Sequence, residues 1–179
     1  MSASTEQIIA ELKARQDIHD VLVRYCRGAD RCDAAMMKSC FHEDAWDDHG
    51  FFKGPAHAFA EQAAASLRER FLSTQHHMTN ATVWIAGEEA RSETYVLARL
   101  RKAEDGELFD VTLSARYLDR FERRDGAWKI VHRLLVSDGT RVDRVDREDA
   151  RLNQGQAGGR GAGDPAHAFF FPARPEDPR

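Results

Sequence analysis

The sequence is poor in cysteine and proline and contains no long apolar run. Its 179 residues include only three cysteines and five prolines. Cys26, Cys32 and Cys40 are odd in number and have no fourth ligand nearby in the sequence, so we expect reduced, buried thiols rather than disulfides or a zinc site. No stretch approaches the ~20 apolar residues of a membrane-spanning helix, and the N-terminus lacks the basic-then-apolar pattern of a signal peptide. These absences predict a soluble, cytoplasmic protein with no membrane partner.

An excess of charge of one sign is also missing. The chain has 26 Lys and Arg against 30 Asp and Glu, a formal net charge of −4, and the two signs are interspersed. Without a basic stripe, we expect no nucleic-acid partner. The 42% of hydrophobic residues is typical of globular proteins, and the length suits one domain with a full core.

Residues 1–140 read as helices followed by strands. A capping box at Ser4–Gln7 and apolar residues at helical spacing predict a long helix that ends near Asp30. Shorter helices are predicted at about 34–40 and 55–71, with a short strand at 45–49. Four long strands follow, at about 74–86, 90–102, 108–122 and 128–136, and Asp-Gly turns separate the last three. We expect an α+β, cone-shaped fold in which a strongly curved, mainly antiparallel sheet wraps around the N-terminal helices and encloses a cavity.

The composition changes in residues 141–179. This tail is first densely charged and then glycine-rich at 154–163, which predicts flexibility. Three consecutive phenylalanines, Phe169–Phe171, are too apolar for a free tail. We expect this docking segment to fold over the mouth of the cone as a lid, or to bind a neighbouring subunit.

One carboxylate and one imidazole suggest a reaction. Asp30 ends the first helix, where an acid opposes the helix dipole, and His76 begins the first long strand. A carboxylate that meets an imidazole in an apolar hollow can take a proton from carbon, because it orients the ring and stabilises the imidazolium. A surface ion pair of Asp30 with Arg27 or Arg31 is the alternative. Adjacent strand residues face opposite sides, so only one of His76 and His77 can point inward.

Four motifs, taken together, carry a resemblance to a known family. They are Tyr-x-x-x-x-Asp at 25–30, Asp-Asp-His-Gly-x-Phe-Lys-Gly at 47–54, His-His-x-x-Asn at 76–80 and Arg-Arg-Asp-Gly-x-Trp-Lys-Ile at 123–130. In this order they resemble the SnoaL-like branch of the nuclear transport factor 2 superfamily, over residues 5–140. That branch includes scytalone dehydratase, bile-acid 7α-dehydratase and hexachlorocyclohexane dehydrochlorinase.

The resemblance implies roles for individual residues. Asp30 matches the family's catalytic aspartate and His76 its catalytic histidine. Tyr25 lies where those lyases carry a pocket tyrosine or lysine, and could equally be plain core. His49 falls where the dehydratases place a second pocket tyrosine, so this chain departs from a strict dehydratase pattern.

Two further residues, Arg133 and Trp84, are candidate substrate contacts. Arg133 corresponds to a pocket arginine of some members, although the match could shift by one residue onto His132, and Arg133 could equally be a salt-bridged strand residue. Trp84 is a further candidate substrate contact, because some sheet aromatics must line any cavity; the alternative is that it belongs to the sheet core. The resemblance implies no metal and no cofactor, and Asp47 and Asp48 match no recognised metal motif. It also implies a homo-oligomer, with a trimer favoured and a dimer possible.

Three functions remain open from the sequence. The first is a cofactor-independent lyase or isomerase, dehydratase-like, acting on a small hydrophobic cyclic molecule of polyketide, steroid or aromatic type. In it, His76 abstracts a carbon-bound proton, Asp30 orients it, and Tyr25 or His49 assists a departing hydroxide or polarises a carbonyl. The alternatives are a non-catalytic small-molecule-binding protein and the small subunit of a ring-hydroxylating dioxygenase-type complex, which would have a filled cone.

Overall fold

A computed structural model of the chain describes residues 3–146, 148 and 154–170. The domain begins with two helices and ends with a long antiparallel meander. The helices are α1 (Thr5–Arg31), α2 (Ala34–Ser39) and α3 (Ala56–Arg70). The strands are β1 (Phe41–Asp48), β2 (Lys53–Pro55), β3 (Ser73–Ala86), β4 (Glu89–Glu104), β5 (Glu107–Arg124) and β6 (Ala127–Arg144). No helix in the described ranges combines the length and the apolar character that crossing a membrane would require.

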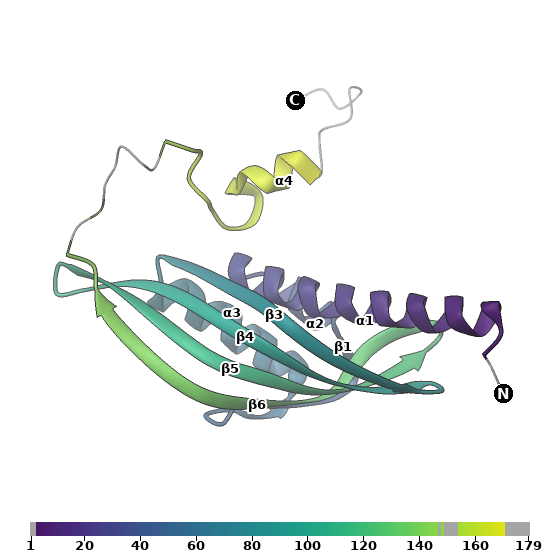
Figure 1. Cartoon of the computed structure of the whole chain (residues 1–179). Coiled ribbons are helices and arrows are strands. Elements are labelled where there is room, and N and C mark those ends of the chain that lie inside the picture. Colours follow the sequence, from purple (N-terminus) through teal and green to yellow (C-terminus); the bar gives the residue numbers. More distant parts are fainter. Residues whose placement is uncertain (1–2, 147, 149–153, 171–179) are drawn as a thin grey trace.

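One six-stranded sheet organises the domain, in the order β2-β1-β6-β5-β4-β3. All neighbouring strands pair antiparallel except β1 and β6, which are parallel. The long strands curve around one side of the helices, and α1 runs along the open side of the sheet (Figure 1). This arrangement confirms the predicted α+β cone.

Local sequence signals account for the main elements. The capping box of α1 forms, with the Ser4 hydroxyl accepting from the Gln7 backbone and the Gln7 side chain accepting from the Ser4 backbone. Both Asp-Gly turns place the two residues at positive φ, at Asp105–Gly106 and Asp125–Gly126, as two-residue hairpin turns of this type require.

Gly28 has a packing role that its place near the end of α1 did not reveal. A Cβ atom at this position would lie 2.8 Å from the Cγ of Met37 and 3.0 Å from its backbone nitrogen. The missing side chain therefore lets α2 pack directly against α1.

Two strand boundaries differ from the prediction, and one short strand was not predicted. The strand β1 starts at Phe41 rather than at residue 45, and β2 was expected to be part of a helix start. The strand β6 continues to Arg144 instead of ending near residue 136. Its last residues are mostly exposed and lack apolar alternation, and their pairing with Phe109–Ser114 of β5 keeps them extended.

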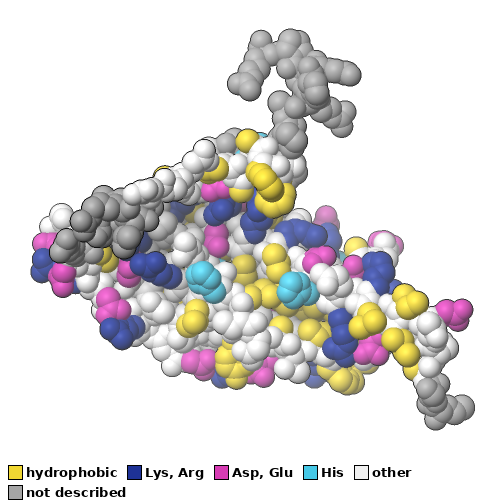
Figure 2. All heavy atoms as spheres, turned by 45° about the horizontal axis from the view of Figure 1, so that its top comes forward, with side chains coloured by type: hydrophobic (Ala, Val, Ile, Leu, Met, Phe, Trp, Pro, Cys, Tyr) yellow, Lys and Arg dark blue, Asp and Glu magenta, His cyan; other side chains and the backbone are white. Residues whose placement is uncertain are grey.

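The described part of the tail lies against the ends of α1 and α3. The Arg160 side chain donates to the backbone oxygens of Leu67, Arg68 and Phe71, at 2.7–3.2 Å, and so caps α3. Asp164 pairs with Arg31 at 3.3 Å. Charged side chains lie between this segment and the body of the domain (Figure 2).

The short helix α4 (Pro165–Phe170) follows this anchored segment. Phe169 and Phe170 are exposed, and Phe170 stacks on Arg27 with 5.0 Å between the guanidinium carbon and the ring centroid. Phe171, the third residue of the predicted docking segment, lies outside the described residues.

Candidate functional site

A cavity of about 360 Å³ lies between the inner face of the sheet and the helices. Its wall is mostly apolar, with alternating residues of β4 and β5 contributing aliphatic side chains. A cavity of this size and lining suits a small apolar ligand. The polar side chains that reach it are Tyr25, His49, Gln62, Ser66, Arg70, His76, Tyr117 and Ser137.

His76 and Asp30 meet at this cavity. The His76 Nδ1 atom lies 2.7 Å from an Asp30 carboxylate oxygen, and the His76 backbone N–H donates to both carboxylate oxygens at 2.9 and 3.1 Å. The Thr74 hydroxyl donates to the Asp30 carbonyl at 3.2 Å. Because the carboxylate accepts from Nδ1, the Nε2 atom of His76 is left for a ligand. His77 is exposed, so of the two adjacent histidines it is His76 that faces inward.

These contacts explain why an acid stands at the end of α1. The carboxylate of Asp30 receives the backbone N–H of β3 as well as the imidazole, so it joins the helix to the edge strand of the sheet. Asp30 lies in the last turn of α1, and His76 occupies the second inward-facing position of β3, 46 residues later. The surface ion pair with Arg27 or Arg31 does not form among the described contacts of Asp30.

Tyr25 lies one helical turn before Asp30 and also lines the cavity. Its ring is buried between Phe41 and Tyr117, each in an edge-to-face contact with centroids 5.7 Å apart. Burial raises the pKa of the Tyr25 hydroxyl above its usual value, and the positive charge of Arg133 offsets this only in part. Burial also raises the pKa of Tyr117. Both hydroxyls therefore remain protonated and can donate hydrogen bonds.

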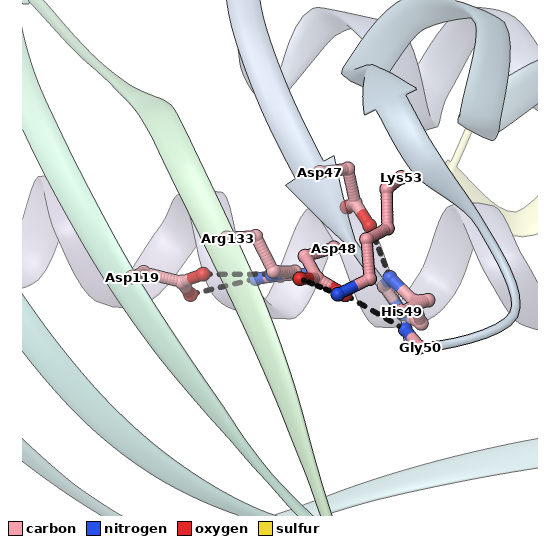
Figure 3. Close-up of polar contacts among 7 residues, drawn as sticks. All are labelled: Asp47, Asp48, His49, Gly50, Lys53, Asp119 and Arg133. Carbon is pink, nitrogen blue, oxygen red and sulfur yellow. Dashed lines mark hydrogen bonds and ion pairs between the residues drawn. The ribbon is translucent and has the colours of Figure 1, made fainter.

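Arg133 points inward but does not line the cavity. Its Nε and Nη2 atoms each donate to one oxygen of Asp119 at 2.7 Å, and both side chains are fully buried (Figure 3). The guanidinium carbon lies 4.0 Å from the ring centroids of both Tyr25 and Tyr117. The Arg133 guanidinium therefore packs against both of the tyrosine rings that line the cavity. This placement does not support the substrate contact expected of Arg133.

His49 lines the cavity and has a carboxylate partner that the sequence analysis did not pair with it. Its Nδ1 atom is hydrogen-bonded to Asp47, which is fully buried (Figure 3). The His49 ring stacks on Phe59 of α3, with centroids 4.0 Å apart and 21° between the planes. Strand alternation was the signal that could have found this pair, since residues 47 and 49 fall on the same face of an extended chain.

Trp84 and His132 lie away from the cavity. The Trp84 side chain is 61% exposed near the end of β3, so the structure does not support its predicted contact with substrate. His132 borders a shallow surface hollow together with Trp84 and Leu134. Of these two neighbours on β6, Arg133 is buried and His132 is partly exposed, and neither lines the cavity.

The site offers no evident metal cage. Within the described residues, no group of three or more His, Cys, Asp or Glu side chains is arranged to hold a metal ion. The three cysteines are buried and free. Burial raises the pKa of Cys26 to about 12, which keeps this thiol protonated.

The fold and the cavity together define a cone-shaped α+β domain with a mostly apolar internal cavity, and comparisons with known proteins give its family. The model of a SnoaL-like domain matches residues 10–134. The chain therefore belongs to the SnoaL-like family, within the nuclear transport factor 2-like fold. No match was found among curated proteins.

Several solved structures share the fold. A candidate scytalone dehydratase from Novosphingobium aromaticivorans is 21% identical, with a TM-score of 0.66 over 78% of this chain and 97% of that one. A type 2 hexachlorocyclohexane dehydrochlorinase (LinA) is 21% identical, with a TM-score of 0.67 over 75% and 91% of the two chains. The type 3 LinA of Novosphingobium barchaimii is 19% identical, with a TM-score of 0.66 over 77% and 94%. At such identities the likeness concerns the fold.

Proposed function

We propose that the protein is a cofactor-independent lyase or isomerase that removes a carbon-bound proton from a small hydrophobic cyclic substrate. One observation carries this proposal: the His76 imidazole lines an apolar cavity while its Nδ1 atom is hydrogen-bonded to the Asp30 carboxylate at 2.7 Å. An imidazole oriented by a carboxylate in this way can act as a general base. The names of its structural neighbours, a dehydratase and dehydrochlorinases, are consistent with elimination chemistry.

The proposed step is a proton transfer from a substrate carbon to His76. The C–H bond breaks and its proton passes to Nε2 of His76. The C–H electrons either remain on the substrate as an enolate or form a new C=C bond while a leaving group departs from the adjacent carbon with the electrons of its own bond. Asp30 stabilises the resulting imidazolium and keeps the ring oriented. Tyr25, whose hydroxyl stays protonated, would donate a hydrogen bond to the oxygen on which negative charge develops.

The open cavity supports a ligand-handling role over that of a dioxygenase small subunit, for which a filled cone was expected. A binding protein without catalysis remains the rival function, and it predicts that ligand affinity ignores the His76–Asp30 pair. A cytoplasmic location and the docking role of the tail stay predictions. We also expect a homo-oligomer, a trimer more than a dimer.

Exchange of carbon-bound hydrogen tests the proposal without knowledge of the natural substrate. Cyclohexanone and 2-tetralone would be incubated in D₂O with the protein, and deuterium at the α-carbons would be followed by NMR. We expect the wild type to accelerate exchange and His76→Ala to lower the rate by roughly 10²–10⁴-fold, the usual contribution of a positioned base. Asp30→Asn should also lower it. His77→Ala is the matched control, because this neighbour is exposed, and it should exchange at the wild-type rate.

Two results would contradict the proposal. One is the absence of exchange with both ketones. The other is equal exchange by wild type and His76→Ala. Ketone binding without exchange, unaffected by either substitution at the pair, would instead favour the binding protein.

A further inference from the structure

The cavity contains a second histidine that is held by a buried carboxylate. His49 and His76 both line it, and each ring uses Nδ1 to contact an aspartate, so each presents Nε2 to a ligand. The two pairs come from different parts of the fold: Asp30 from the end of α1, Asp47 from the end of β1. Nothing in the proton abstraction proposed above requires the second pair.

The His49 ring is fixed on several sides. Its backbone N–H donates to the carbonyl of Phe52 at 2.9 Å, and its ring stacks on Phe59. The His49 side chain is only 9% exposed. A ring held by a hydrogen bond and an aromatic stack can deliver a proton along one direction, which is what a general acid needs.

Asp47 lies beside a second buried ion pair. Asp47 is the register partner of Arg133 on β6, whose own partner on β5 is Asp119. Asp119 accepts both guanidinium hydrogen bonds (Figure 3). The second carboxylate oxygen of Asp47 is buried and has no hydrogen-bond partner among the described residues. Arg133 thus has Asp119 as its carboxylate partner, and Asp47 has the His49 ring as its own hydrogen-bond partner.

Asp30 has a different environment. Its side chain is 17% exposed, and it already accepts a backbone N–H at both oxygens. Two titratable pairs in unlike surroundings are the usual arrangement for separate acid and base roles. The two carboxylates differ in burial, since Asp47 is fully buried, whereas the His49 and His76 side chains are similarly exposed, at 9% and 11%.

We infer that His49 is the general acid of the reaction and that Asp47 is its positioning residue. This inference rests on the proposed function and narrows it to loss of an oxygen leaving group, from a cyclic β-hydroxy carbonyl compound. As His76 takes the α-proton, the C–O bond breaks with its electrons on oxygen. In this step His49 acts in its imidazolium form, and its Nε2–H protonates that oxygen, which leaves as water. His76 ends with one extra proton and His49 with one fewer, and exchange with solvent resets both. A halide leaves without being protonated, so His49 would not act as a general acid in a dehydrohalogenation.

Two probes that differ only in the leaving group test this division of labour. 3-Hydroxycyclohexanone must lose hydroxide, whereas 3-acetoxycyclohexanone loses acetate, which leaves without protonation. Both give cyclohexenone, which is measured by its ultraviolet absorbance. We expect His49→Gln to slow loss of hydroxide by about 100-fold or more, and loss of acetate by less than about tenfold. Exchange of α-hydrogen, which depends on His76, should fall by a smaller factor than loss of hydroxide does, and circular dichroism checks that the variant is folded.

Asp47 is tested with its neighbour as control. Asp47→Asn should slow loss of hydroxide by about tenfold or more and change the ¹⁵N signals of the His49 ring. Asp48→Asn should do neither, because Asp48 turns away and contacts Lys53 at 2.9 Å (Figure 3). His49→Phe, which keeps an aromatic ring against Phe59, is a second variant if the glutamine variant does not fold.

The possible negative results distinguish failure of the His49 inference from failure of the proposed function. If the wild type exchanges α-hydrogen but eliminates neither group, or if His49→Gln and His49→Phe eliminate hydroxide normally, the inference is wrong and the proposed function stands. If exchange and both eliminations fall together in the His49 variants, the ring acts elsewhere and the inference is again wrong. If the wild type shows no exchange, the proposed function fails and this inference fails with it.

Discussion

The buried ion pair between Arg133 and Asp119 should be the most sensitive polar contact in the domain. The guanidinium donates two hydrogen bonds of 2.7 Å to a carboxylate, both side chains are fully buried, and two tyrosine rings lie 4.0 Å from the guanidinium carbon. Asp119→Leu would leave this cation in the core without a counter-charge. Removing one member of a buried pair costs about 3–5 kcal/mol. In a protein of this length that loss corresponds to a decrease in Tm of roughly 6–20 °C.

A double substitution separates the orphaned charge from the loss of packing. In Asp119→Leu/Arg133→Met no buried charge is left unpaired, so the double variant should be more stable than the single one. Urea unfolding, at one protein concentration because assembly shifts apparent stability, measures all three proteins. Asp17→Asn is the matched control: its pair with Lys13 is exposed, at 2.6 Å, and should contribute less than about 0.5 kcal/mol. A loss below about 1 kcal/mol in Asp119→Leu, or a double variant no more stable than it, would refute the reasoning.

Two other predictions concern acid stability and assembly. Hydrogen bonds from Arg101, and then from Arg99, lower the pKa of Asp110 to about 2. Since the unfolded value is about 4, this stabilisation is complete above pH ~4 and disappears as the pH falls towards 2. Asp110→Asn should therefore lose less unfolding free energy than wild type over that interval, and equal losses would contradict the assignment. Leu97 and Tyr95 are exposed on the outer face of β4, and Leu97→Glu should lower the mass measured by light scattering if this face joins subunits. An unchanged oligomer would exclude it.

Local chemistry made most of the architecture predictable. The capping box at Ser4 and the Asp-Gly turns depend on neighbours within four residues, so their structures follow from short stretches of sequence. The strand β2 was missed because three residues cannot display alternation, and Pro55 resembles a helix start. The end of β6 was missed because its exposed residues are held by pairing with β5, which no local pattern reveals.

The candidate site was predictable only in part. Asp30 and His76 could be paired because each stands at an element boundary and matches a family motif, although contact across 46 residues is a tertiary fact. Trp84 illustrates the opposite case, since an aromatic residue in a strand suggests a core position and only the register decides which face it occupies. Arg133 suggested a ligand contact because some family members keep a pocket arginine at this place, and the structure instead pairs it with Asp119 as a salt-bridged strand residue.

The side chains along β5 make one end of the cavity wall aliphatic and the other end polar. Alternate residues share one face, and on the inner face Val111, Leu113 and Ala115 are followed by Tyr117 and then by Asp119 with its arginine. His76 is in register with Leu113 through Ala98 of β4, so the proposed base lies over the aliphatic part. The His49 ring lies nearer the polar end, 6.1 Å from that of Tyr117. A substrate whose carbon skeleton covers the aliphatic floor would therefore extend its oxygen atoms towards the tyrosines and His49. That polarity favours a ring with oxygen substituents on one side over a uniformly apolar molecule.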